Sequence, residues 1–200
     1  MAEELDISGR INLRQSRVLV LDGNPQAIIL MRQILGGFGV RATHACEKPA
    51  EAQQVFNEQV LDLMIVDPLF ADDSGFEFLR WVRRQEDSGN RCTSIIAAMS
   101  HQTLGNVRAA RDAGANIIVA KPLSPELLLQ RIAWVAREKR PFIVAGAYVG
   151  PDRRFKNQGP PPGMDGRRAD DLSLAVPDAQ APNMSQQEVD DLFKPRRISL

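Results

Sequence analysis

The sequence predicts an α/β fold, a doubly wound five-stranded parallel sheet with helices on both faces, followed by a largely disordered C-terminal tail. Short apolar runs of strand length alternate five times with segments that carry apolar residues at helical spacing. This alternation is typical of right-handed βαβ crossovers. From about residue 151 the chain is rich in Pro, Gly, Asp and Arg, and such a composition buries too little apolar area to order itself.

Five apolar runs are expected to form the strands. The first and third contain uninterrupted apolar runs, 18–21 and 63–66, and each run is followed by an acid, Asp22 and Asp67 respectively. A continuous apolar run is typical of a strand buried on both faces of a parallel sheet. The expected strands are residues 17–22, 40–45, 61–67, 94–99 and 116–120.

Five helices are expected to connect and follow these strands. Gly36 and Gly37 end the first helix, and Gly114 closes the fourth. Ser124 is expected to cap the fifth helix, with Pro125 at its first position. The expected helices are residues 26–36, 48–58, 75–85, 103–113 and 125 onward.

The composition favours a cytoplasmic protein that binds neither DNA nor membranes. The 25 basic and 25 acidic residues cancel, so no charge excess predicts nucleic-acid binding. The apolar run at residues 142–145 is far shorter than the roughly 20 residues that span a bilayer, and the polar N-terminus does not resemble a secretory signal. Cys46 and Cys92 lack metal-ligand spacing, and we expect both to be buried, reduced thiols.

The chain is expected to have five parts. They are a polar N-terminal extension (1–16), a folded domain (17–140), a packed, arginine-rich extension (141–156), a disordered linker (157–183) and a short amphipathic helix motif (184–200). In the last part, Ser185 and Glu188 match a capping box. A helix of under about 12 residues is marginal alone, so we expect this one to fold against a partner.

Three ionisable residues follow strands of the predicted sheet. Asp22 ends the first strand, Asp67 ends the third, and Lys121 follows the fifth. The carboxyl ends of parallel strands share one edge, where open α/β sheets bind ligands. Carboxylates can hold Mg²⁺, a lysine can contact a phosphoryl oxygen, and an aspartate can become an aspartyl-phosphate. A site for a divalent cation and a phosphoryl group is therefore predicted here.

Residues 16 to about 137 resemble the receiver domain of two-component response regulators, and the predicted fold is accordingly receiver- or flavodoxin-like. The resemblance rests on VLVLD at 18–22, LMIVD at 63–67, AGA at 113–115 and AKP at 120–122. It implies that Asp67 is the phosphoacceptor and that Lys121 contacts the phosphate. It also implies an Mg²⁺ ion on Asp22, Asp67 and the carbonyl of Leu69, and a histidine kinase or phosphotransfer protein as partner.

The sequence departs from the family pattern at four positions. Gly23 stands where the family has a second acid that touches the metal. Pro68 has no amide hydrogen to donate to a phosphoryl oxygen. Met99 replaces the switch Ser or Thr, with Ser100 one residue too late, and Ile118 replaces the aromatic switch residue. These departures leave open a degenerate receiver that acts as an adaptor without phosphorylation.

The segment around residues 148–154 lies outside the predicted sheet and is expected to bind a nucleotide. Tyr148, Asp152, Arg153 and Arg154 resemble the arginine-rich tail of chemotaxis-regulator-like proteins that bind cyclic di-GMP. Guanidinium groups can stack on purines and contact guanine edges or phosphates. The alternatives for this segment are a solvated basic linker, or arginines that dock on an acidic face of the same domain.

The segment MSQQEVDDLF at residues 184–193 is similar to the N-terminal motif of the flagellar switch protein that chemotaxis regulators bind. Val189, Leu192 and Phe193 would be its anchors in a groove. The segment could dock on its own receiver surface or recruit another receiver protein.

The leading functional hypothesis is an atypical single-domain response regulator that acts by protein contact and is not an enzyme. Flagellar or chemotaxis proteins are the expected partners, with cyclic di-GMP as a second input. The phosphorylation-independent adaptor is the main alternative. A hydrolase that uses Asp67 covalently is the third hypothesis, and the sequence offers no general base for it.

Overall fold

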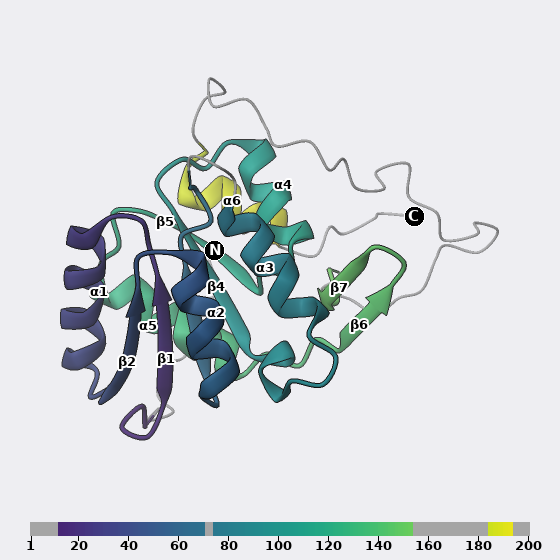
Figure 1. The fold of residues 1–200 in the computed structure, drawn as a ribbon. Helices are drawn as coiled ribbons and strands as arrows, with labels where there is room; N and C mark the ends of the chain where they lie inside the picture. Colours follow the sequence, from purple (N-terminus) through teal and green to yellow (C-terminus); the bar gives the residue numbers. More distant parts are fainter. Residues whose placement is uncertain (1–11, 71–73, 154–183, 194–200) are drawn as a thin grey trace.

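The computed structural model describes residues 12–70, 74–153 and 184–193, and it confirms the predicted fold class. The central sheet is parallel and has the strand order β2-β1-β3-β4-β5 (Figure 1). Its strands are β1 (Arg17–Leu21), β2 (Ala42–Cys46), β3 (Leu63–Val66), β4 (Ser94–Met99) and β5 (Ile117–Ala120). The strand order reverses between β1 and β3, so the loops after these two strands meet at one edge of the sheet.

Helices cover both faces of the sheet. They are α1 (Pro25–Gly37), α2 (Pro49–Glu58), α3 (Ser74–Arg84), α4 (Leu104–Asp112) and α5 (Pro125–Ala136), with a short 3₁₀ turn, η1, at Gly89–Cys92. The apolar sides of α1 and α5 share one core with the sheet. The sides of α2, α3 and α4 pack on the opposite face in two further clusters. No helix in the described part of the chain is long and apolar enough to cross a membrane.

The predicted helix boundaries have the expected local causes. The Ser124 hydroxyl accepts a hydrogen bond from the amide of Leu127 at 3.1 Å, with Pro125 in the first position of α5. Asn24 caps α1 in the same way, through its side-chain oxygen. Gly114 has φ of +95°, a conformation that disfavours any residue with a side chain, and it ends α4 as expected.

Residues after α5 form an antiparallel hairpin that the sequence did not predict as strands. Its strands are β6 (Phe142–Ala145) and β7 (Tyr148–Pro151). The hairpin packs against α3, and its anchor Tyr148 is 2% exposed, with its hydroxyl donating to the carbonyl of Pro151 at 2.6 Å. Burial raises the pKa of Tyr148 to about 12. Residues 142–151 thus form a second, two-stranded sheet.

Arg83 is a buried arginine that holds the end of α3 to two other segments, the η1 turn and the loop between α4 and β5. Its guanidinium donates to the carbonyl oxygens of Gly114, Arg91 and Thr93, and to Oδ1 of Asn116. Burial lowers its pKa to about 10. A buried guanidinium is tolerated because these acceptors replace its water.

A last helix, α6 (Gln186–Phe193), lies against β5 (Figure 1). The expected capping box is present: the Ser185 amide and hydroxyl both donate to Glu188 Oε2, at 2.7 and 2.8 Å. Most of the predicted N-terminal extension and the whole predicted linker at 157–183 lie outside the described residues. The expectation for the cysteines was half wrong, because Cys46 is buried but Cys92 is exposed on η1.

Candidate functional site: a carboxylate pair bridged by a lysine

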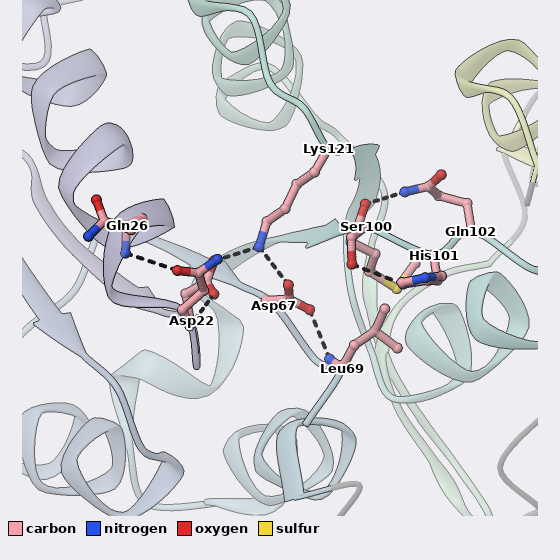
Figure 2. Close-up of polar contacts among 10 residues, drawn as sticks. Asp22, Gln26, Asp67, Leu69, Ser100, His101, Gln102 and Lys121 are labelled. Atoms are coloured by element: carbon pink, nitrogen blue, oxygen red, sulfur yellow. Dashed lines mark hydrogen bonds and ion pairs between the residues drawn. The ribbon is translucent and has the colours of Figure 1, made fainter. Parts of the chain in front are cut away.

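The predicted site residues lie together at the carboxyl edge of the sheet. Asp22 and Asp67 directly follow the neighbouring strands β1 and β3, and their amides continue the sheet, donating to the carbonyls of Cys46 and Leu21 at 3.1 and 2.8 Å. Lys121 follows β5, two strands away from β3. Figure 2 shows its side chain reaching down to the two carboxylates. The fold therefore brings Lys121 to two carboxylates that precede it by 99 and 54 positions in the chain.

Lys121 bridges the two aspartates. Its Nζ lies 2.5 Å from Oδ2 of Asp22 and 2.5 Å from Oδ2 of Asp67 (Figure 2). Asp22 and Asp67 are 6% and 9% exposed, and in the described part of the chain Lys121 is the cation that pairs with both of their carboxylates. The trio carries a formal charge of −1, which favours a further cation at the site.

Loop amides hold the remaining carboxylate oxygens. The amide of Asn24 donates to Oδ1 of Asp22, and the amide of Leu69 donates to Oδ1 of Asp67, both at 2.9 Å. Each carboxylate is therefore fixed from two sides, by Lys121 and by the loop that follows its strand. This arrangement fixes the orientation of both carboxylates.

The pKa of Asp67 is raised above its ordinary value. Burial is the main cause, because it disfavours the charged carboxylate, and the charge of Asp22 adds to the effect. The charge and hydrogen bond of Lys121 and the Leu69 amide act in the opposite direction but do not cancel the burial.

A model of the response regulator receiver domain matches residues 18–133, which is more than half of the chain. The chain belongs to this family.

Individual relatives and structures agree with this assignment. The sensory/regulatory protein RpfC of Xanthomonas campestris pv. campestris is 28% identical over 142 residues, which is 70% of this chain and 19% of RpfC. The chemotaxis protein CheY4 of Vibrio cholerae shares the fold, with a TM-score of 0.54, 23% identity, and coverage of 59% of this chain and 96% of CheY4. The receiver domain of the Arabidopsis thaliana histidine kinase CKI1, complexed with Mg²⁺ and BeF₃⁻, has a TM-score of 0.54 and 25% identity, and the match covers 60% of this chain and 90% of that domain.

Receiver domains bind Mg²⁺ at the phosphorylation site, and the donors present here fit such an ion in chemistry. Asp22 and Asp67 supply the oxygen ligands that Mg²⁺ prefers, and both reach the same cationic group. The carbonyl of Leu69 would complete the protein ligands. Among the described residues there is no cluster of three or more His, Cys, Asp or Glu side chains that could hold a metal, so the carboxylate set is a minimal one.

Gly23 stands where the family has a second acid, and an aromatic ring lies next to it. A Cβ atom on Gly23 would lie 3.2 Å from the ring of Phe70, closer than most contacts of real Cβ atoms. The Phe70 ring, from the loop after β3, therefore borders the space that a side chain at position 23 would enter. Gly23 departs from the family pattern and can be recognised in the sequence, whereas Phe70 lies in a loop, where no sequence pattern places its ring beside position 23.

The other departures also have visible consequences. Met99 is fully buried and packs in the same apolar cluster as Ile118. Ser100 is exposed, and its hydroxyl lies 3.1 Å from Nδ1 of His101. Pro68 lies under the start of α3, where a Cβ on Gly75 would come within 2.5 Å of the Pro68 carbonyl oxygen. Pro68 is thus packed closely against the start of α3.

The predicted nucleotide-binding residues are brought together only in part. Arg153 lies with its guanidinium carbon 4.5 Å from the centre of the Tyr148 ring, and its Nη1 donates to Oδ1 of Asp112 at 2.7 Å. The Asp152 amide donates to the carbonyl of Pro141. Arg154 lies outside the described residues. In this state Arg153 is docked on its own domain, the arrangement that the sequence analysis held open as an alternative.

The predicted partner-binding helix is docked on the domain as well. Val189 is fully buried between α4 and β5, in the cluster that contains Val107, Ala110 and Ile118. Leu192 and Phe193 belong to α6, but their side chains lie outside the described ones.

Proposed function

We propose that this protein is a cytoplasmic response regulator in which Asp67 accepts a phosphoryl group from a histidine kinase or phosphotransfer protein. Its output is a protein contact, and it is not an enzyme that acts on metabolites. The observation that carries the proposal is the single ammonium group of Lys121, held 2.5 Å from both Asp22 and Asp67 at the carboxyl edge of the sheet.

The chemistry of the proposal is a transfer between two side chains. An oxygen of the ionised Asp67 attacks the phosphorus of a phosphohistidine, the P–N bond breaks as the P–O bond forms, and the imidazole leaves with a proton from solvent. Lys121 then exchanges its contact with Asp67 for one with a phosphoryl oxygen, which matches part of the added charge of about −1.5 to −2. When bound by Asp22, Asp67 and Leu69, Mg²⁺ would supply the remaining positive charge.

Amide NMR with Mg²⁺ and beryllofluoride tests this function. We expect shifts of the amide signals of Asp67 and Lys121 in the parent protein, no shifts in Asp67→Asn, and unchanged behaviour in Asp87→Asn, where an exposed aspartate serves as the matched control. Unchanged signals in the parent protein would contradict phosphorylation at Asp67.

The phosphorylation-independent adaptor is the second candidate function. It is favoured by the Phe70 ring beside Gly23, by the buried methyl thioether of Met99 and by the absent amide hydrogen of Pro68. In this case Asp22, Asp67 and Lys121 form a permanent buried ion pair that maintains the shape of the domain. The beryllofluoride titration separates the two functions, because the adaptor gives no response.

We also propose cyclic di-GMP as a second input at Tyr148, Asp152, Arg153 and Arg154. The support is the position of Arg153, whose guanidinium already lies over an aromatic ring and faces one carboxylate that a ligand could replace. Calorimetry with cyclic di-GMP should give binding heat for the parent protein and for Arg32→Ala, and none for Arg153→Ala/Arg154→Ala. Absence of heat from the parent protein would remove this input.

The output partner that we propose is a flagellar or chemotaxis protein. The support is the resemblance of residues 184–193 to the flagellar switch motif, together with the helix and capping box that this segment forms. Binding of the purified flagellar switch protein should change when Val189 is replaced by Asp and stay constant for Gln187→Ala, an exposed position of the same helix. Equal affinity of the Val189→Asp variant and the parent would contradict this partner.

A further inference from the structure

Helix α6 covers the free edge of the central sheet. β5 is an edge strand, so its outer N–H and C=O groups have no neighbouring strand. The side-chain amide of Gln186 makes the hydrogen bonds that a neighbouring strand would make. Its Oε1 accepts from the amide of Ala120 at 2.6 Å, and its Nε2 donates to the carbonyl of Ile118 at 3.4 Å. Position 186 therefore recognises the backbone of β5.

An apolar contact accompanies this polar one. Val189, one turn after Gln186, is 0% exposed and lies in one cluster with Val107 and Ala110 of α4 and Ile118 of β5. The amide of Met184 donates to the carbonyl of Gln102 at 2.6 Å, which fixes the start of the segment beside α4. A helix of eight residues is unstable alone, so these contacts supply its stability.

The contact with α5 is ionic and incomplete. Oδ2 of Asp190 lies 2.6 Å from Nη2 of Arg131, and Oδ1 of Asp190 accepts from Gln186. The Nε of Arg131 is buried, and it has no hydrogen-bond partner among the residues that the structure describes. A guanidinium prefers a bidentate contact with a carboxylate. Asp190 makes a monodentate contact because its other oxygen accepts from Gln186. Docking of α6 thus leaves a buried donor unsatisfied, which weakens the contact.

We propose that α6 is a displaceable internal ligand of the face formed by α4, β5 and α5. The face fits an acidic amphipathic helix that presents a glutamine to the edge of β5, a β-branched or similar apolar side chain to Val107 and Ile118, and a carboxylate to Arg131. α6 occupies the face within the same chain and closes it to other helices. A partner helix whose carboxylate engages both Nη2 and Nε of Arg131 displaces α6. This mechanism does not require phosphorylation of Asp67.

Hydrogen exchange at the Ala120 amide reports the internal contact directly, because in the described structure its acceptor is Gln186. We expect Gln186→Ala and Val189→Asp to lower the protection of this amide by about tenfold or more, and Gln187→Ala to leave it unchanged. Far-UV circular dichroism checks that the domain remains folded, and the milder Gln186→Ala variant keeps the test informative if Val189→Asp unfolds. Unchanged protection in both variants would overturn the proposal.

Competition with a labelled peptide tests the surface itself. The probe is a capped, fluorescent peptide with the sequence of residues 184–193. We expect it to bind the full-length Val189→Asp variant about tenfold or more tightly than the parent chain, where α6 competes at the high effective concentration of a linked segment. A peptide carrying Asp190→Asn should bind the full-length Val189→Asp variant about fivefold more weakly than the unsubstituted peptide does. Equal affinity for parent and variant, or no binding to either, would overturn the proposal.

A second copy of the chain is the other source of an α6 helix. Dilution of the parent protein distinguishes the two sources, because the population of a contact within one chain does not depend on protein concentration. Constant protection of the Ala120 amide over about a hundredfold dilution supports the internal ligand. Loss of protection on dilution would assign the contact to a second molecule and overturn the proposal.

Discussion

Replacement of Lys121 by methionine should destabilise the protein, and the effect should depend on pH. The substitution keeps most of the side-chain volume but leaves Asp22 and Asp67, 6% and 9% exposed, facing each other without their shared cation. Removal of one partner from a buried ion pair costs about 3–5 kcal/mol. Since the side chain of Lys121 is 17% exposed and water reaches part of the site, we expect about 2–4 kcal/mol near neutral pH.

The pH dependence follows from the direction of the Asp67 shift. The folded-state pKa of Asp67 already lies above its ordinary value because of burial, and it rises further when Lys121 is absent. A folded state that binds the proton more tightly than the unfolded state loses stability as pH rises through the folded pKa. The loss in Lys121→Met should therefore be largest near neutral pH and should shrink as the pH falls through the raised folded pKa of Asp67 toward its unfolded value, about 3.9.

Urea unfolding at several pH values measures both effects. Lys139→Met, the replacement of an exposed lysine, is the matched control and should change the free energy of unfolding by less than about 0.5 kcal/mol. A loss below about 1 kcal/mol in Lys121→Met near neutral pH, with no pH dependence, would refute the reasoning, because the three groups would then be solvated rather than paired.

Three further predictions concern positions around this site and the hairpin. Gly23→Asp should bind Mg²⁺ weakly, and the added Phe70→Ala should raise the affinity about tenfold by calorimetry, since the ring then no longer crowds the new carboxylate; equal affinities would contradict a steric role of the ring. Arg83→Met should cost about 3–5 kcal/mol in urea unfolding because four acceptors, buried or part-buried, each lose a hydrogen bond, whereas the exposed neighbour Arg84→Met should cost under about 0.5 kcal/mol. Tyr148 should ionise near pH 12 in an ultraviolet titration, and ionisation near pH 10 would show that the hairpin does not bury the ring.

The central site could be predicted from the sequence because each of its residues directly follows an apolar run. Asp22 and Asp67 each end an uninterrupted apolar strand, and Lys121 follows the fifth strand. In a parallel sheet these ends meet at one edge, so the local pattern fixes the approximate place of each group. The detail that one Nζ contacts both carboxylates at 2.5 Å depends on side-chain conformations that the pattern does not contain.

The surroundings of the site could not be predicted in the same way. Phe70 lies in a loop, where no periodicity assigns a direction to its ring. Arg83 follows the apolar stripe of α3 and would ordinarily point to solvent; carbonyl groups of distant segments hold it inside. The β6 strand has the apolar character expected of a strand, but its pairing with β7 depends on the turn between them and on the surface that α3 offers.

The sequence by itself determined the order along the chain of the five sheet strands and their helices, the place of Asp22, Asp67 and Lys121 at one sheet edge, and the amphipathic character of the last helix. These are properties of local periodicity, capping and strand ends, which short stretches of chain contain completely. Tertiary structure decided that the Phe70 ring borders the space beside Gly23 and that α6 lies on β5, because both depend on the fit between surfaces far apart in the chain. Such a fit arises only when the whole domain has packed.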